Sequence, residues 1–426
     1  MTLMLPFDRT TENDPALCLS GGGFRAALFH LGALRRLNEL GVLSRVSVIS
    51  SVSGGSIVNG VLASRWSSLS RDSNGTFRNF DEIIRSPLRA FCQLDLRTPL
   101  LLGHGLNPLK WFGKGRPPFT VSGNELSRSY DALFDGKLLI DVPESNSNTP
   151  RFVFCATSVN TGACWHFHSG SLARMGEFYT GYSDVNDVRI SEAVAASSAF
   201  PLTFSAFELD SARLREVSRV DPWGSTRPLS GKRDAITLER ILLTDGGVYD
   251  NLGVEPVWQR FKAILSSDAG RPFASVATCS QAPLSRLNRV TSISEEQVGA
   301  VRKRWLIEQY LSKARVGTLW AINTNVGDYP IDNAHSYSPE VRPLFSSVRT
   351  DLNSFSDGEI ACIENHGYAL ADAAIRSRTP QLACNLDAEF VWPNPSWVND
   401  DKATACIRTS ASRTFARDVA KWLLGS

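Results

Sequence analysis

The chain has 426 residues, of which 42% are hydrophobic and 21% are charged. This composition excludes a disordered or collagen-like chain, and the length allows one large domain or two to three smaller ones. The formal net charge is only +2, so the sequence shows no basic surplus of the kind that indicates nucleic-acid binding. The sequence contains no run of about 18 apolar residues, so no membrane-spanning helix is predicted.

The amino end has no basic segment followed by an apolar one, so it does not read as a secretory signal. The eight cysteines are scattered along the chain and none forms a CxxC pair. That distribution is typical of buried thiols in a reducing compartment. We therefore expect a cytoplasmic protein, for which any contact with a membrane would be peripheral.

The first 66 residues predict alternating strands and helices. Residues 16–20 and 46–51 are short apolar runs typical of buried strands. Residues 24–40 place Leu28, Leu31 and Leu34 at helical spacing, and a second helix is predicted over 56–66. A strand–helix–strand–helix order favours a parallel sheet covered by helices.

Residues 67–120 interrupt this alternation and predict an insertion of loops and short helices. The insertion mixes apolar, aromatic and basic residues at 100–102 and 109–114, including Trp111 and Phe112. Such a mixture suits a lid or a membrane-contact element. The alternative is a surface subdomain that packs Trp111 and Phe112 against the core.

The rest of the chain continues the α/β pattern. Strands are predicted over 151–157, 164–168, 241–244, 273–279 and 318–323, and helices over 190–199, 295–316 and 355–377. The basic residues of 295–316 favour a solvated helix face, with contact to anionic lipid as the alternative. Because no Pro/Gly/Ser-rich linker divides the chain, we expect a single domain over 1–426, in which 257–426 completes the sheet and adds carboxyl-terminal helices.

A candidate nucleophile lies between the second strand and the second helix, in the pentapeptide SVSGG. Ser53 stands at its centre, with Ser51 before it and Gly55 after it. A serine on a tight strand-to-helix turn is the nucleophile-elbow arrangement, and the following helix amino end favours developing negative charge. The alternative is an ordinary Ser/Gly-rich turn.

A candidate oxyanion loop follows the first strand. Gly21, Gly22 and Gly23 precede Phe24 and Arg25, and three glycines allow backbone N–H groups to approach a substrate closely. The spacing matches neither dinucleotide nor P-loop fingerprints, which argues against a nucleotide phosphate loop. Arg25 could bind phosphate or support the loop.

A candidate catalytic carboxylate follows the strand 241–244. Asp245 precedes Gly246 and Gly247 at the carboxyl end of that strand, where ligands gather in open α/β sheets. The alternative is a simple Asp-Gly turn, and Asp250 and Asn251 read as turn formers.

Together these motifs resemble the patatin-like phospholipases, a family of serine lipid acyl hydrolases. The family pattern is a Gly-Gly-Gly-x-Arg loop, a G-x-S-x-G elbow and an Asp-Gly-Gly motif. The chain carries them in that order as SGGGFRA, SVSGG and DGGVYDNLGVEP, within a resemblance that covers residues 16–256. It departs from the pattern at Ser51 and Ala26, both small residues in positions where glycine is common.

The resemblance implies a three-layer α/β/α sandwich with a mostly parallel central sheet. It also implies hydrolysis of carboxylic ester bonds in phospholipids or lysophospholipids through an acyl-enzyme, without a metal or cofactor. In this reading Ser53 is the nucleophile, Asp245 its partner in a dyad and Gly21, Gly22 and Gly23 the oxyanion hole. Arg25 and Gly54 support the loop or the substrate.

Two alternatives remain open. The order Ser53, Asp245, His366 also fits a His-containing triad of the α/β-hydrolase type, although His366 lies in a helix-like segment. A catalytically silent lipid-binding protein would also keep these motifs. The histidines show no HxxxH or HExxH spacing, so no metal site is predicted.

Overall fold

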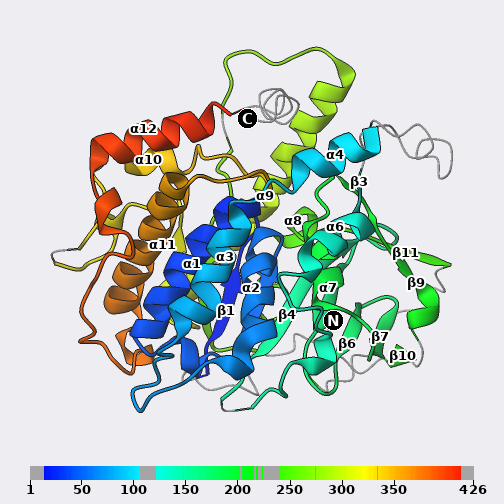
Figure 1. Cartoon of the computed structure of the whole chain (residues 1–426), viewed down its shortest axis with the longest axis horizontal. Coiled ribbons are helices and arrows are strands. Elements are labelled where there is room, and N and C mark those ends of the chain that lie inside the picture. The colour runs from blue at the N-terminus through cyan, green and yellow to red at the C-terminus, as the bar shows by residue number, and fades with distance from the viewer. Residues whose placement is uncertain are drawn as a thin grey trace.

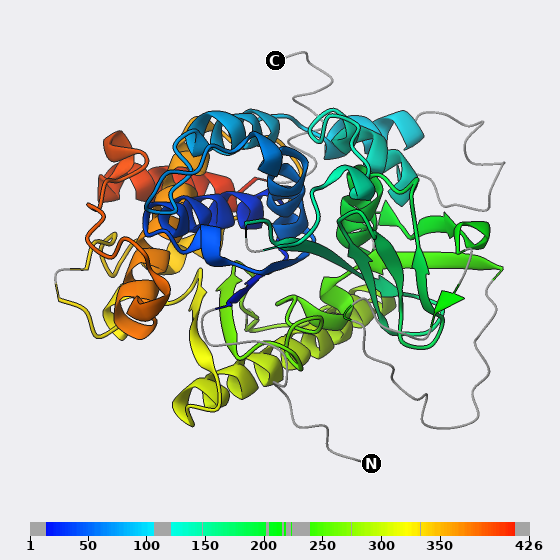
Figure 2. The same ribbon diagram turned by 90° about the horizontal axis from the view of Figure 1, so that it is seen from below.

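The computed structural model describes residues 14–105, 121–146, 148–201, 204–214, 217–218, 223, 239–273, 275–332 and 334–413. Eleven of the described strands form one mixed sheet between two helical layers (Figures 1 and 2). The sheet comprises β1 (Ala16–Leu19), β2 (Val48–Val52), β4 (Arg151–Ser158), β5 (Cys164–His168), β6 (Arg174–Glu177), β7 (Gly181–Asp184), β9 (Phe207–Asp210), β10 (Val217–Ser218), β11 (Arg240–Asp245), β12 (Ala263–Asp268) and β13 (Val316–Ala321).

The sheet has a parallel half and an antiparallel half. Strands β4, β2, β1, β12 and β13 lie side by side and run parallel. Beyond β4, the strands β5, β6, β7 and β10 form an antiparallel meander. Strands β1 and β2, in the middle of the parallel half, are buried on both faces, as is typical of a parallel sheet covered by helices.

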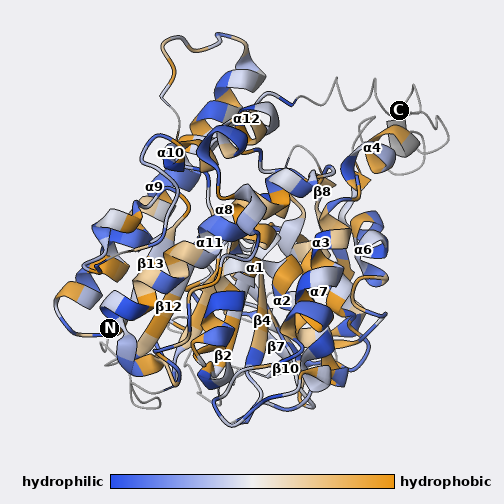
Figure 3. Ribbon diagram, turned by 60° about the vertical axis from the view of Figure 1, so that its left-hand side comes forward, coloured by the Kyte–Doolittle hydropathy of each residue, from blue (hydrophilic) through white to orange (hydrophobic). Residues whose placement is uncertain are grey.

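Helices cover both faces of the sheet. One layer contains α1 (Gly23–Glu39), α2 (Gly54–Arg65) and α11 (Asp357–Arg378), and α9 (Pro283–Leu311) runs along the opposite face (Figure 2). The leucines that predicted the first helix, including Leu28, Leu31 and Leu34, are fully buried. Figure 3 shows the apolar residues concentrated on the central strands. The three-layer α/β/α arrangement expected from the sequence is confirmed.

Helices α1 and α11 approach each other through glycine. A Cβ atom added at Gly32 would lie 1.9 Å from the carbonyl oxygen of Glu364, and one at Gly367 would lie 2.0 Å from that of Phe29. Neither position has room for a side chain, so the two helix backbones are in direct contact. Through this contact α11, in the carboxyl-terminal part of the chain, packs on α1, the helix that follows the glycine loop (residues 21–23).

The predicted strand over 273–279 is wrong, because the strand of this region is β12, ten residues earlier. Phe273 is 38% exposed and lies outside any strand. The second half of β12 is polar in sequence but fully buried, because Ser267 bonds His30 and Asp268 forms an ion pair with Lys303 at 2.8 Å. The polar sequence of this segment is typical of the end of a strand, but its tertiary partners allow it to form part of a central strand.

The described part of the insertion contains helices α3 (Ser86–Cys92) and α4 (Arg97–Gly105). Leu101 and Leu102 are buried, so this leucine run packs inward and does not form an exposed membrane contact. The lid or membrane role predicted for Trp111 and Phe112 falls outside the described residues.

Several basic residues of α9 have structural partners, whereas Arg304 and, just after the helix, Lys313 are exposed as expected of a solvated face. Arg302 pairs with Glu255 at 2.9 Å, and Lys303 pairs with Asp268. Arg315, just after the helix, donates to the carbonyl of Phe261 at 2.7 Å. Among the described residues, no helix combines the length and apolar character needed to cross a bilayer.

We predict that Gly32→Ala destabilises the protein. The new methyl group would collide with the backbone of α11, and overpacking of this kind costs about 1–3 kcal/mol. The matched control is Gly299→Ala in α9, where an added Cβ meets nothing within 4 Å. That change should leave stability unchanged or raise it by up to about 1 kcal/mol. Urea unfolding of both variants measures the difference, and equal stabilities would contradict the prediction.

Candidate active site

Strands β2 and β11 meet end to end beside β4. Strand β2 runs parallel to β4 and ends with Val52 opposite Cys155. Strand β11 arrives from the other direction and ends with Asp245 opposite Ala156, the next residue of β4. Because β5 occupies the other edge of β4, β2 and β11 share one edge. The register therefore brings Asp245 next to the residue that follows Val52, which is Ser53.

Ser53 has a backbone conformation that side chains rarely adopt. Its φ is 51° and its ψ is −118°, and α2 begins at the next residue. Strain of this kind costs about 1–3 kcal/mol and clusters at functional sites. It turns the Ser53 side chain out of the strand at the amino end of the helix, as in a nucleophile elbow.

The elbow packs directly on the glycine loop. A Cβ atom at Gly54 would lie 2.0 Å from the carbonyl oxygen of Gly23, and one at Gly55 would lie 2.5 Å from that of Leu19. Glycine is therefore required at both positions. The serine that replaces glycine at position 51 is accommodated, because its hydroxyl bonds Ser56 at 3.0 Å and accepts from Asn59 at 2.9 Å.

The Asp245 carboxyl lies near enough to the Ser53 side chain for that side chain to lower its pKa slightly. Its Oδ1 also accepts the N–H of Gly247 at 2.7 Å. Burial raises the pKa of Asp245 to about 7, and the negative charge of Glu295 on α9 contributes to the rise. A carboxylate with that pKa is a far better base near neutral pH than an exposed aspartate.

The end of α7 (Ile190–Ser198) holds both halves of this arrangement. The hydroxyl of Ser197 accepts the N–H of Ser53 at 2.9 Å, and its carbonyl accepts the N–H of Gly246 at 3.1 Å. The carbonyl of Ala199 accepts the N–H of Asp245 at 3.0 Å. Sequence reasoning missed Ser197, although its place in a run of small residues is the signal that could have indicated close packing.

The structure corrects the role expected of Gly21. Its N–H donates to the carbonyl of Asn251 at 3.1 Å, so it is not available to an oxyanion. Within the described residues, the N–H groups of Gly22 and Gly23 donate to no acceptor. Asn251, which the sequence indicated only as a turn former, thus fixes the start of the glycine loop. The N–H of Gly54, the first residue of α2, likewise has no backbone acceptor among the described residues.

Arg25 supports the loop and is too deeply buried to reach a lipid phosphate. Its guanidinium donates to the carbonyls of Ala269 at 2.6 Å, Val348 at 2.8 Å and Ser346 at 3.1 Å. Burial lowers the pKa of Arg25 to about 9, which still leaves the group charged at neutral pH. Of the two roles that the sequence left open, the geometry favours support of the loop.

The geometry gives no support to the triad with His366. Its Nε2 bonds the carbonyl of Ile322 at 2.8 Å, and its ring stacks on Phe345 with centroids 4.1 Å apart. Burial lowers the pKa of His366 to about 4. His30 is occupied in the same way, by the hydroxyl of Ser267 and the carbonyl of Ser20.

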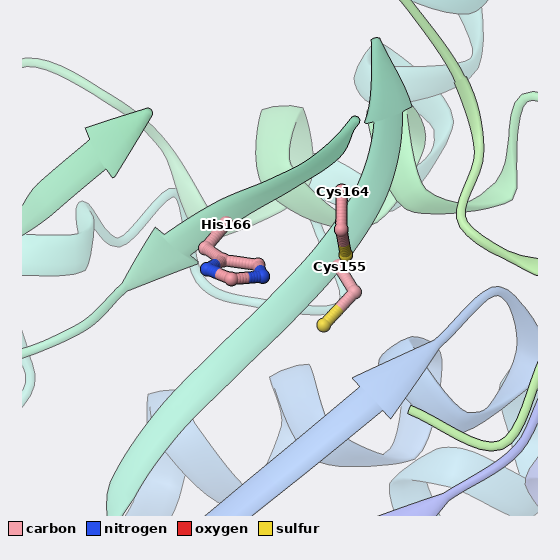
Figure 4. Close-up of side chains that lie close together, drawn as sticks. All are labelled: Cys155, Cys164 and His166. Atoms are coloured by element: carbon pink, nitrogen blue, oxygen red, sulfur yellow. The ribbon is translucent and has the colours of Figure 1, made fainter. Parts of the chain in front are cut away.

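A cavity of about 610 Å³ lies away from Ser53 and Asp245. It is lined by β5, the turn between β6 and β7, and the segment after α8 (Gly247–Asp250), and it includes Cys164 and His166. Cys155 on the neighbouring strand completes a group of three potential metal ligands (Figure 4). The sequence predicted no metal site because it has no HxxxH or HExxH spacing, and Cys155 is brought to His166 only by the pairing of β4 with β5.

The sequence matches the family model for patatin-like phospholipases over residues 17–258, more than half of the chain. The chain therefore belongs to the patatin-like phospholipase family, a family of lipid acyl hydrolases. A search of curated proteins finds no match.

Two solved structures show similarity at low sequence identity. Human GIVD cytosolic phospholipase A2 is 12% identical, with a TM-score of 0.45, 94% of this chain covered and 60% of that chain. VipD from Legionella pneumophila is 15% identical, with a TM-score of 0.34, 87% of this chain covered and 68% of that chain. The chain thus spans about 60% of the length of the human enzyme.

We predict that Ser197 is a positioning residue for Ser53. In Ser197→Ala the Ser53 N–H loses its acceptor, and the elbow should shift enough to slow covalent labelling by a fluorophosphonate roughly 10- to 100-fold. The matched control is Ser198→Ala, which removes a hydroxyl bonded to the Val194 carbonyl and to Tyr130 but not to the elbow.

Both variants should lose about 1–3 kcal/mol of stability, because each removes a buried hydrogen bond. Only Ser197→Ala should slow labelling well beyond any change in melting temperature. Equal labelling rates in the two variants would show that Ser197 is merely part of the core.

Proposed function

We propose that the protein is a lipid acyl hydrolase that cleaves carboxylic ester bonds of phospholipids or lysophospholipids with a dyad of Ser53 and Asp245. The observation that carries the proposal is the strand register, which places Ser53, on a strained elbow, beside the buried Asp245 carboxyl, and burial raises the pKa of that carboxyl to about 7. Membership of the family supports the substrate class.

In the first half of the reaction, the Asp245 carboxylate accepts the proton of the Ser53 hydroxyl as its oxygen attacks the ester carbonyl. The tetrahedral intermediate collapses when Asp245 returns that proton to the departing alcohol. Ser53 then carries the fatty acyl group as an ester. In the second half, Asp245 takes a proton from water, the hydroxide attacks this ester, and the fatty acid leaves as Ser53 recovers its proton.

The negative charge on the tetrahedral oxygen would be stabilised by backbone donors. Gly22 and Gly23 present N–H groups without acceptors at the amino end of α1, and Gly54 begins α2 beside them. One oxyanion donor contributes about 3–4 kcal/mol in related hydrolases. Two helix amino ends that converge on one point add favourable dipoles.

A catalytically silent lipid-binding protein is the second candidate. Lipid binding alone would require neither the backbone strain at Ser53 nor the raised pKa of Asp245. Both features are present. A fluorophosphonate that fails to label the wild-type protein while lipid still binds would favour this alternative.

We predict that Ser53→Ala and Asp245→Asn each lower kcat/KM for a lysophospholipid by about 10³-fold or more. In the wild-type protein, kcat/KM should rise about tenfold per pH unit up to pH 7 and level off above it, because only ionised Asp245 acts as the base. The residual activity of Asp245→Asn should lack this rise.

Suitable controls are Ser64→Ala, in the same helix as the elbow, and Asp184→Asn, an exposed carboxylate on β7. Product mass spectrometry with a lipid panel identifies the bond cleaved. Full turnover by either dyad variant would refute the proposed mechanism.

We also propose that α9 contacts the lipid surface. Leu287, Val290 and Val301 are 64%, 58% and 57% exposed and share one face of this helix. The same helix carries Glu295, whose charge acts on Asp245. A lipid bilayer is the occupant that fits a hydrolase whose substrate resides in one.

The double variant Leu287→Asn/Val290→Asn should weaken sedimentation with phosphatidylcholine vesicles and slow hydrolysis of vesicle lipid about tenfold, because it removes the apolar contact. Hydrolysis of a short water-soluble ester should not change. Val391→Asn, an equally exposed apolar residue elsewhere, is the control. Unaltered vesicle binding in the double variant would exclude this helix as the contact.

A further inference from the structure

Three soft or borderline metal ligands come together on the pair β4 and β5. In the antiparallel register Cys155 lies directly opposite His166, and Cys164 precedes His166 by two residues on the same strand. Side chains that are opposite or two apart point to the same face of a sheet. The two sulfur atoms and an imidazole nitrogen lie within 4.8 Å of one another, and Figure 4 shows the three side chains close together on β4 and β5.

This spacing is close to what a single zinc ion requires. Zn–S bonds of about 2.3 Å and Zn–N bonds of about 2.0–2.1 Å place the donors of a tetrahedral site roughly 3.5–3.8 Å apart. Small side-chain rotations would close the difference. Both cysteines are reduced in the structure, so both sulfur atoms are available as thiolate ligands.

The group is accessible from one side. Cys164 and His166 form part of the wall of the 610 Å³ cavity, whereas Cys155 is fully buried beneath them. A metal ion could therefore enter from the cavity, and a water molecule or a ligand there could supply a fourth donor. Three protein ligands with one open position are typical of zinc sites that bind a further group.

Charged groups of both signs surround the three ligands, and Arg260 lines the cavity beside Glu255. Asp250 and Glu255 lie near enough to act on the Cys164 thiol, and Glu255 lines the cavity. Arg302 pairs with both carboxylates and offsets part of their charge.

We propose that Cys155, Cys164 and His166 bind one zinc ion, with the fourth coordination position directed into the cavity. This site is separate from the proposed dyad, which needs no metal. It is nevertheless connected to it, since the carbonyl of Cys155 accepts the hydroxyl of Ser197 at 2.6 Å and Ser197 holds the Ser53 N–H.

The chain provides an internal comparison. Cys362 and Cys406 form a second hydrogen-bonded thiol pair, in α11 and α12 (Asp400–Ala411). Among the described residues, no histidine joins that pair within ligand distance. If paired thiols alone captured zinc, both pairs would do so. If zinc binding also requires the imidazole and access from the cavity, only the pair on β4 and β5 will bind zinc.

The experiment uses the reduced full chain with Cys279→Ser and Cys384→Ser, which removes the two exposed thiols. Zinc is added, excess is removed by gel filtration, and bound metal is measured by mass spectrometry. Cobalt(II) added to the apoprotein reports thiolate ligands by its near-ultraviolet charge-transfer absorption. We expect one zinc per chain and a cobalt band that zinc abolishes.

In that background, Cys164→Ala and His166→Gln should each weaken zinc binding at least about 100-fold, whereas Cys406→Ala should leave it unchanged. Melting temperatures without metal show whether each variant is folded, and a zinc-dependent rise should occur in Cys406→Ala but not in Cys164→Ala. Less than stoichiometric zinc in the parent, or equal zinc binding in Cys164→Ala, would overturn the proposal.

Discussion

The arrangement of the site depends on one constraint, the meeting of β2 and β11 along the same edge of β4. Ser53 follows β2 and Asp245 ends β11, and the register of β4 places them at adjacent positions although 192 residues separate them. The end of α7 then fixes the junction, because Ser197 holds the backbone of both turns. Hydrogen bonds to backbone leave little freedom for either side chain to move away.

The site also requires close backbone contacts, which only glycine allows. The elbow touches the glycine loop through Gly54 and Gly55, and α1 touches α11 through Gly32. These contacts stack the loop, the elbow and the carboxyl-terminal helix in one continuous layer. The strain at Ser53 persists because packing on both sides determines its conformation.

Buried charge supports the same layer. Arg25 binds three carbonyls of segments near residues 269 and 346–348, and Asp250 accepts the N–H of Val254 at 2.7 Å. Buried groups of this kind are stable only when their hydrogen bonds are satisfied. They join parts of the chain that lie far apart in sequence to the loops around the dyad.

The sequence by itself determined the fold class, most elements and the identity of the motif residues. Hydrophobic periodicity and glycine positions are local properties, so the opening strands and helices and the turns at Ser53 and Asp245 could be predicted. The sequence did not predict β12, because the polar half of this strand is buried through its contacts with His30 and Lys303.

Only the tertiary structure decided which backbone donors stay available, since the acceptor of Gly21 is Asn251, 230 residues away. It also decided that Arg25 supports the loop, that Ser197 holds the elbow, and that Cys155 lies beside Cys164 and His166. These relations depend on strand register and burial, which act between distant segments and leave no periodic signal in the sequence.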